Sequence, residues 1–256
     1  HHSSVFVNHR QIINSCFQRQ FIQFKSHFGF YFIDLDFLSG KISEEQIAYL
    51  DQTLGKIKYT SSELSIPSIS FPSNPVKIRE EKEGSVQCSI RFGLPAISRT
   101  HPDYFKFSLM NTVLGGYFGS RLQKNIREDK GFTYGISSSL APYPRGGYWV
   151  VGTDVNGENV DATLAEIKKE ITILQTELIP QDELEIVQNY LMGSFTGELT
   201  QAFDIAEKVR VIQLNGLAPD FYDQFQDEVL KIQAQDIRDM AAKYLNLDLM
   251  HEVIVG

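Results

Sequence analysis

The sequence predicts an α+β protein whose strands lie mainly before its helices. Alternating apolar side chains, such as Cys88, Ile90 and Phe92, are typical of half-buried strands. After residue 160 the apolar spacing becomes that of amphipathic helices and remains so to about residue 245. Strands followed by a run of helices are characteristic of the α+β class.

Residues 1–60 predict a helix, a strand and a second helix. Apolar residues at helical spacing run from Ile12 to Phe28, and an apolar run from Phe30 to Leu38 predicts the strand. Ser43, followed by two glutamates, is a typical N-cap for a helix over 44–54. The segment 61–84 carries serines and prolines without a helical period, which favours a linker between domains. The alternative is an extended edge strand inside one domain.

In the remainder of the chain, apolar and polar residues alternate first, and apolar residues recur at helical spacing later. Strands are predicted at 85–92, 132–140 and 148–155, with a turn or hairpin at 142–147, and Trp149 and Val151 are expected in the core. Helices are predicted at 102–113, 160–178, 181–200, 201–215, 219–232 and 235–245, before a last strand at 247–255. His101 is interpreted as structural. Asp182, Glu183 and Glu185 are interpreted as the solvated start of a helix, where carboxylates favour the helix dipole.

The composition excludes several classes of function. The chain has 256 residues, 42% hydrophobic, with a net charge of −8, which argues against a nucleic-acid partner because phosphate binding needs clustered Lys and Arg. No apolar run approaches the roughly 20 residues of a membrane span. The two cysteines, Cys16 and Cys88, lie in apolar patterns and are expected as free thiols. This favours a reducing compartment and a cytoplasmic location, with the periplasm as the alternative.

The stretch from Leu114 to Gly135 has the most distinctive pattern in the chain. A glycine-rich turn and the possible N-cap Ser120 predict the start of a short helix, and Gly131 predicts its end. Arg127 then lies in the last turn of that helix, and Tyr134 near the start of the next strand. Both side chains could point into the same space, where they would donate hydrogen bonds to a carbonyl or an oxyanion. A surface arginine and a half-buried strand tyrosine remain the alternative.

The string LGGYFGSRLQKNIREDKGFTYG resembles the signature of the second domain of pitrilysin-type zinc peptidases. This inverzincin family includes insulin-degrading enzyme and mitochondrial processing peptidase. The resemblance implies a sandwich in which helices cover one face of a mostly antiparallel sheet. It also implies that Arg127 and Tyr134 are catalytic and substrate-binding residues, and that the glycines contact substrate as a secondary role. The matching positions are Gly115, Gly116, Gly119, Ser120, Arg121, Leu122, Arg127, Glu128, Gly131 and Tyr134.

The metal-binding half of the family signature is missing from this chain. Family members hold zinc through an H-x-x-E-H motif. None of the 6 histidines here has a second histidine at the required spacing with a glutamate between them. The resemblance therefore implies that zinc and the general base lie on an H-x-x-E-H partner domain or subunit. This chain is expected to hold no metal and to be inactive alone.

A weak internal similarity between two segments of the chain, called the internal echo below, bears on the domain organisation. Aligning Phe21 with Ile237 and Gly40 with Gly256 superimposes a predicted helix, a strand and a glycine in both segments. Pitrilysin-type proteins are built from domains of similar topology. We therefore expect residues 1–60 to be the end of a preceding domain, 61–80 a linker, and 81–256 the domain that carries the Arg/Tyr pair.

Two functions fit these expectations. The first is the zinc-less half or subunit of a zinc metallopeptidase, which binds peptide substrate and completes the active site of its partner. The second is a catalytically inactive structural or binding subunit of the same fold. Retention of both Arg127 and Tyr134 favours the first, because a purely structural copy does not need the pair.

Overall fold

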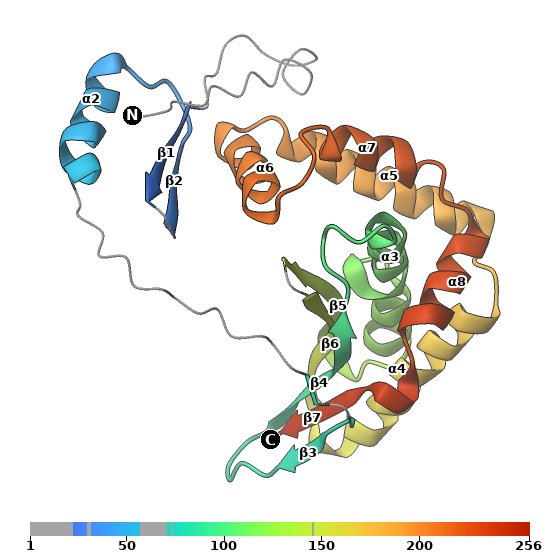
Figure 1. Cartoon of the computed structure of the whole chain (residues 1–256). Coiled ribbons are helices and arrows are strands. Elements are labelled where there is room, and N and C mark those ends of the chain that lie inside the picture. Colours follow the sequence, from blue (N-terminus) through green and yellow to red (C-terminus); the bar gives the residue numbers. More distant parts are fainter. Residues whose placement is uncertain (1–22, 30–31, 57–70, 73, 145) are drawn as a thin grey trace. The chain divides into compact units, whose positions relative to one another are not determined.

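The computed structural model describes residues 23–29, 32–56, 71–72, 74–144 and 146–256 (Figure 1). The chain divides into two compact units. Unit 1 comprises His1–Ser68 and Gly193–Asp223, and unit 2 comprises Ile69–Met192 and Gln224–Gly256. Each unit is described by itself below.

Unit 2 is built on a five-stranded sheet with the order β3-β7-β4-β6-β5. Its strands are β3 (Lys77–Glu80), β4 (Gln87–Ala96), β5 (Thr133–Tyr143), β6 (Gly146–Asn156) and β7 (His251–Val255). Only the pair β3 and β7 is parallel, and the other three pairings are antiparallel. The β5–β6 hairpin forms where the sequence predicts it, and β5 is an edge strand.

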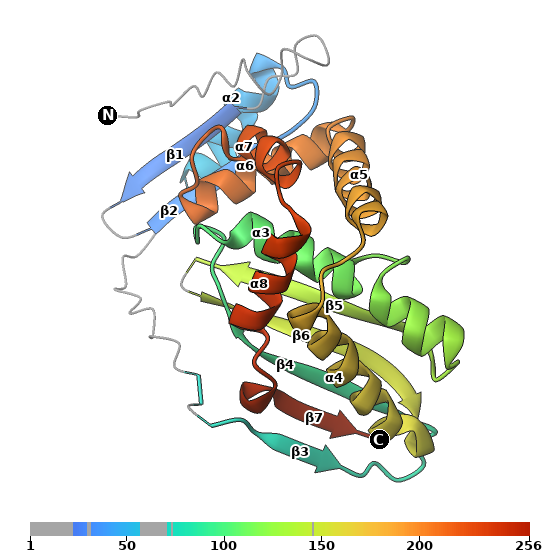
Figure 2. The same ribbon diagram turned by 90° about the vertical axis from the view of Figure 1, so that its right-hand side faces the viewer.

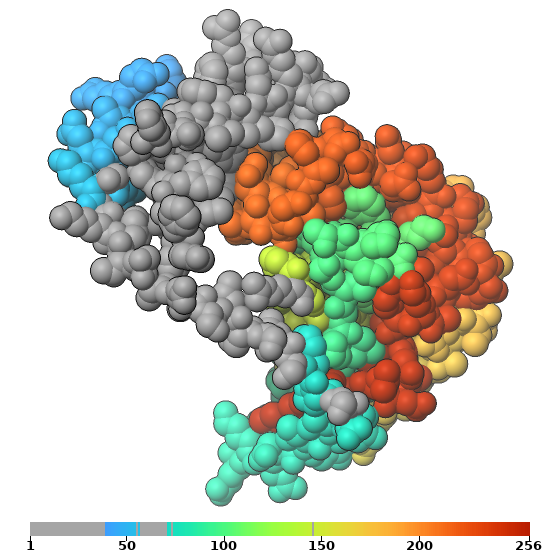
Figure 3. Space-filling model, in the orientation of Figure 1, coloured from blue at the N-terminus to red at the C-terminus, as the bar shows by residue number. Residues whose placement is uncertain are grey.

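Helices cover one face of this sheet (Figure 2). They are α3 (Tyr104–Asn111), α4 (Val160–Thr176) and α8 (Ala234–Tyr244). Figure 3 shows α3 in green against α8 in red. The core between the layers buries Phe92, Phe107, Trp149, Val151 and Ile167 almost completely. Burial of such side chains stabilises the unit by about 1.5–3 kcal/mol each. The predicted fold class, a mostly antiparallel sheet with helices on one face, is confirmed.

A buried polar cluster joins α3 to the sheet. The Asn111 Oδ1 accepts hydrogen bonds from the Trp149 Nε1 and the Ser138 Oγ, each at 2.7 Å. The Asn111 Nδ2 donates to the Ser138 carbonyl at 3.3 Å. All three residues are buried, so these bonds fix the helix against β5 and β6 without leaving the indole N–H unsatisfied.

Unit 1 contains β1 (Gln23–Gly29), β2 (Phe32–Leu38), α2 (Glu44–Thr53), the 3-10 turn η1 (Leu54–Lys56) and α6 (Ala202–Asn215). Ser43 caps α2 as predicted, in a capping box with Gln46. The Ser39 Oγ donates to the Ala202 carbonyl at 2.5 Å and so ties the end of β2 to α6. Two helices, α5 (Gln181–Glu198) and α7 (Phe221–Val229), have residues in both units.

Two predictions for the N-terminal part need correction. The helix expected over 12–28 is wrong for 23–28, because Gln23–Gly29 pairs with Phe32–Leu38 as an antiparallel strand. Residues 12–22 lie outside the described part of the chain. The local spacing of apolar residues fitted a helix, but the partner strand decides the backbone conformation. The internal echo loses its helix-on-helix match for the same reason.

The segment predicted as a linker is partly a strand. Its last residues, Lys77–Glu80, form β3 at one edge of the sheet, and residues 61–70 lie outside the described part. The alternative of an edge strand therefore holds for these 4 residues. The predicted domain boundaries remain a prediction. The strand expected from Ser85 begins at Gln87, and Val86 before it is exposed.

Candidate functional site

The helix α3 continues directly into a 5-residue π-helix, η2 (Thr112–Gly116). The predicted glycine-rich turn is therefore wrong for Gly115 and Gly116, which end a helix, whereas Gly119 does lie in the turn that follows. Gly115 is buried, and a Cβ there would lie 2.6 Å from the Ser138 Oγ and 2.7 Å from the Ser138 N. The lack of a side chain lets the helix end pack on β5.

The next helical segment is also a π-helix, η3 (Gln123–Asp129). Its last turn is held by hydrogen bonds from the Lys130 N to the Asn125 carbonyl and from the Phe132 N to the Ile126 carbonyl, both at 3.0 Å. Gly131 follows with φ +65°, so the predicted helix end is confirmed. Ser120 stands directly before the first helical residue, Arg121, and its carbonyl accepts from the Lys124 N at 2.9 Å, as an N-cap residue would. Its buried Oγ, however, has no hydrogen-bond partner among the described residues and makes no side-chain cap.

Arg127 and Tyr134 converge, as the spacing suggested. The Arg127 Nε donates to the Tyr134 carbonyl at 2.8 Å, and the guanidinium carbon lies 5.9 Å from the centre of the Tyr134 ring. The Tyr134 side chain is exposed, at 93%, whereas the Arg127 side chain is only 27% exposed. The tyrosine is therefore not half-buried, and its hydroxyl is accessible to a ligand.

A β-bulge in β5 presents Tyr134 in this way. Thr133 pairs with Val155 and Ile136 with Thr153, and the register shifts between them. Hydroxyl groups fix the bulge: the Thr133 Oγ1 donates to the Asp154 carbonyl at 2.8 Å, and the Thr153 Oγ1 donates to the Gly135 carbonyl at 3.0 Å. Bulges re-aim side chains at sheet edges. The alternation of the sequence gave no sign of this bulge.

Phe118 is a further residue of the site, and sequence reasoning missed it. The Arg127 guanidinium carbon lies 4.4 Å from the centre of the Phe118 ring, within the range of a cation–π interaction. The phenylalanine side chain is 65% exposed. Phe118 follows Tyr117 among the glycines of the resemblance string, where two adjacent aromatic residues gave no periodic signal.

A cleft of 860 Å³ lies beside η3 and the start of α5. Arg121 and Glu183 line it and form a bidentate ion pair, with N–O distances of 2.8 and 2.7 Å. The hydrogen bonds to Glu183 raise the pKa of Arg121 above its ordinary value. The predicted helix start is confirmed, and Asp182 and Glu185 are exposed, but Glu183 is ion-paired and partly buried rather than solvated. The other charged residues of the cleft are of both signs, namely Lys124, Asp129, Lys130, Lys169, Glu170 and Asp182.

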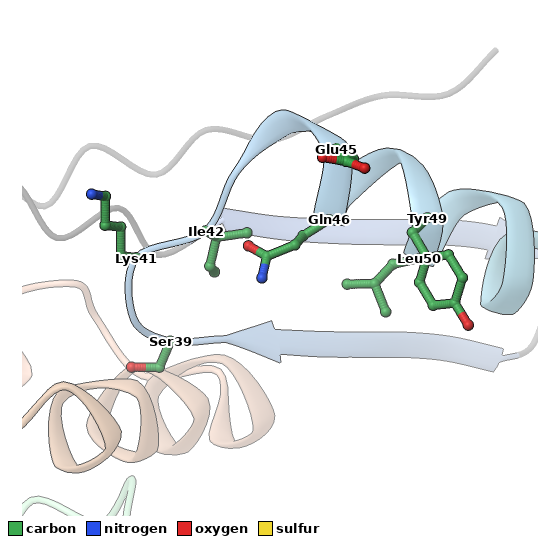
Figure 4. A pocket seen from close by; sticks show the side chains of 7 residues that line it. All are labelled: Ser39, Lys41, Ile42, Glu45, Gln46, Tyr49 and Leu50. Atoms are coloured by element: carbon green, nitrogen blue, oxygen red, sulfur yellow. The ribbon is translucent and has the colours of Figure 1, made fainter.

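A second hollow, of 510 Å³, lies in unit 1 between α2 and the end of β2 (Figure 4). It is lined by Ser39, Lys41, Ile42, Glu45, Gln46, Tyr49 and Leu50. These side chains are a mixture of apolar, polar and charged groups. No residue of α2 is buried. The hollow therefore offers no set of groups arranged for chemistry.

Two histidines, His101 and His251, have structural partners. The His101 Nδ1 accepts from the Asp103 N at 3.0 Å, and the His251 Nδ1 accepts from the Val76 N at 3.1 Å. Within the described residues, no group of three or more His, Cys, Asp or Glu side chains could hold a metal ion. A zinc ion thus does not fit the donors of this part of the chain. No helix among these residues combines the length and apolar character needed to cross a membrane.

Comparison with known proteins adds a family relationship. Residues 37–191 match the model of the "Peptidase M16 inactive domain". A curated relative, "Uncharacterized zinc protease YmxG" of Bacillus subtilis, is 23% identical over 61% of this chain and 38% of its own length. The chain thus spans less than half of that relative.

Two crystal structures resemble the fold. The peptidase M16 inactive domain from Pseudomonas fluorescens superimposes with a TM-score of 0.68 and 26% identity, over 75% of this chain and 46% of that one. A protease from Helicobacter pylori gives a TM-score of 0.73 at 17% identity, over 84% and 53% of the two chains.

Proposed function

The chain belongs to the M16 peptidase family as an inactive peptidase domain, and from this premise we propose that it completes the active site of a zinc-binding M16 partner and binds the peptide substrate there. The partner carries the H-x-x-E-H motif, the zinc ion and the general base, either in the same polypeptide or in a separate subunit. This chain supplies donor groups and positions the peptide, and it has no peptidase activity alone.

The convergence of Arg127 and Tyr134 carries the proposal. The Tyr134 hydroxyl is exposed and donates to the oxyanion that develops at the scissile carbonyl. Arg127 holds a neighbouring carbonyl of the peptide through N–H groups not used by its Nε bond to the Tyr134 carbonyl. Such fixed donors stabilise a transition state because they require no reorganisation when the charge develops.

The edge position of β5 supports the peptide-binding role. The strand has β6 on one side only. The Tyr134, Ile136 and Ser138 carbonyls already accept hydrogen bonds from side chains of this chain. In this proposal an extended peptide pairs with the remaining backbone groups of the open edge. Backbone hydrogen bonds of this kind give affinity with little sequence selection. The glycines Gly116 and Gly119, both exposed, are secondary substrate contacts in this proposal, whereas Gly115 is buried against Ser138.

The second candidate is a structural or binding subunit without a part in catalysis. One observation favours it: the Arg127 Nε is bonded to the Tyr134 carbonyl of its own chain, as a brace between η3 and β5 would be. The two candidates differ in what removal of the Tyr134 hydroxyl does to turnover.

The decisive experiment measures cleavage of quenched peptides by the H-x-x-E-H half, with and without this chain. Tyr134→Phe should lower kcat by about 10²–10³-fold, because one oxyanion donor is lost, and should leave binding of the peptide nearly unchanged. Tyr143→Phe is the matched control, since Tyr143 is an exposed tyrosine at the far end of the same strand. Equal activity of Tyr134→Phe and wild type would assign the chain to the structural alternative.

A further inference from the structure

We infer that Phe118 is a positioning residue that holds the Arg127 guanidinium in the orientation required for substrate. The inference rests on the proposed function of Arg127. The guanidinium carbon lies closer to the Phe118 ring, at 4.4 Å, than to the Tyr134 ring, at 5.9 Å. The nearest carboxylate, of Glu128, is 3.8 Å from the Arg127 Nη1, which is long for a hydrogen bond. Of the two aromatic rings beside the guanidinium, that of Phe118 is therefore the nearer.

The segment that carries Phe118 is itself held in place from both sides. Before it, Gly115 packs on Ser138, and the Tyr117 ring packs against the Tyr190 ring with centres 4.8 Å apart and planes inclined by 34°. After it, Gly119 approaches the Tyr117 ring so closely that a Cβ would lie 2.8 Å from the Tyr117 Cε2. These contacts hold the backbone from which the Phe118 ring projects, although the ring itself is exposed.

A fixed ring restricts the guanidinium in a way that a carboxylate would not. An arginine stacked on an aromatic face keeps its in-plane N–H donors free, while an ion pair would use them. The Nε bond to the Tyr134 carbonyl fixes one edge of the plane and the Phe118 ring fixes its face. The remaining donors then have a defined direction before the peptide arrives, which lowers the entropy lost on binding.

The test compares Phe118→Leu with Phe118→Tyr in the assembled enzyme. Phe118→Leu should lower kcat/KM by about two- to fivefold, the equivalent of an exposed cation–π contact. Phe118→Tyr should retain the activity because its ring can stack in the same way. In an Arg127→Met background, Phe118→Leu should have no further effect. Phe203→Leu, at another exposed phenylalanine, is the control for a general loss of an aromatic surface.

A second readout needs no partner. In NMR spectra of this chain, the Arg127 Nε–Hε signal should show a ring-current shift that Phe118→Leu abolishes and Phe118→Tyr keeps. An unchanged signal in Phe118→Leu, or an equal loss of activity in the Arg127→Met background, would overturn the inference. If the wild-type chain stimulates cleavage and the Phe118→Leu variant stimulates it equally, the inference about Phe118 is wrong while the proposed function stands. No stimulation by the wild-type chain would instead refute the proposed function.

Discussion

Replacing Gly115 by alanine tests whether close packing of the helix end on β5 holds the site together. The new Cβ would lie 2.6 Å from the Ser138 Oγ, 2.7 Å from the Ser138 N and 3.0 Å from the Leu122 Cδ1. The first contact could be relieved by rotation of the Ser138 side chain, which would break its hydrogen bond to the Asn111 Oδ1. The second involves the backbone of a strand that is paired with β6, so relief requires the end of η2 to move away from the sheet.

The size of the effect follows from this overlap. Overpacking of a closed site by one methyl group costs about 1–3 kcal/mol. A loss of 1 kcal/mol lowers the Tm of a domain of 150–250 residues by about 2–4 °C. Gly115→Ala should therefore reduce the Tm of unit 2 by roughly 2–12 °C. The same shift would displace Phe118, so the Arg127 ring-current signal should weaken as well.

The assay is thermal unfolding followed by the fluorescence of Trp149, which is the one tryptophan of the sequence and is buried in unit 2. Gly157→Ala is the matched control, because Gly157 is an exposed glycine of the same unit. Its added Cβ would meet only the Cys88 Sγ, at the ordinary contact distance of 3.7 Å. Alanine there should leave the Tm nearly unchanged. A Tm for Gly115→Ala equal to that of wild type or of the control would refute the packing argument.

Two further predictions concern stability. Asn111→Leu leaves the buried Trp149 indole N–H without an acceptor and should cost about 1–3 kcal/mol in urea unfolding, whereas the double change with Trp149→Phe should show a smaller loss than the sum of the single changes. Hydrogen bonds from Lys243 and then Tyr244 lower the pKa of Asp103 below its ordinary 3.8. The stability contributed by Asp103 is therefore present above the pKa of the unfolded state and is lost as the pH falls through the lower folded value. The difference in urea midpoint between wild type and Asp103→Asn should be largest near pH 7 and shrink below about pH 4; a difference that grows on acidification would contradict this sign.

Local pattern alone determined the elements that are long and regular. The helix α4, predicted over 160–178, buries Leu164, Ile167, Ile171 and Leu174, which recur at helical spacing. The β5–β6 hairpin follows from two alternating runs on either side of a turn. In both cases the apolar period matches the period of the backbone, so burial and local conformation agree.

The site could be predicted only in part. Spacing and family resemblance placed Arg127 and Tyr134 together, and Gly131 gave the end of the helix between them. Phe118 was missed because a contact between a turn residue and a helix residue leaves no period in the sequence. Glu183 was misjudged because its partner Arg121 comes from a distant segment, and pairing between distant segments is invisible to local reasoning.

By itself the sequence determined the α+β class and the regular elements of unit 2, because these depend on residue type and short-range periodicity. The family resemblance, rather than periodicity, singled out Arg127 and Tyr134. Only the tertiary structure decided that residues 23–29 form a strand, that Lys77–Glu80 join the sheet as its edge, and that a bulge exposes Tyr134. Each of these depends on which strand lies alongside. Backbone hydrogen bonds between strands are formed by every residue type, so the side chains alone do not specify their partner.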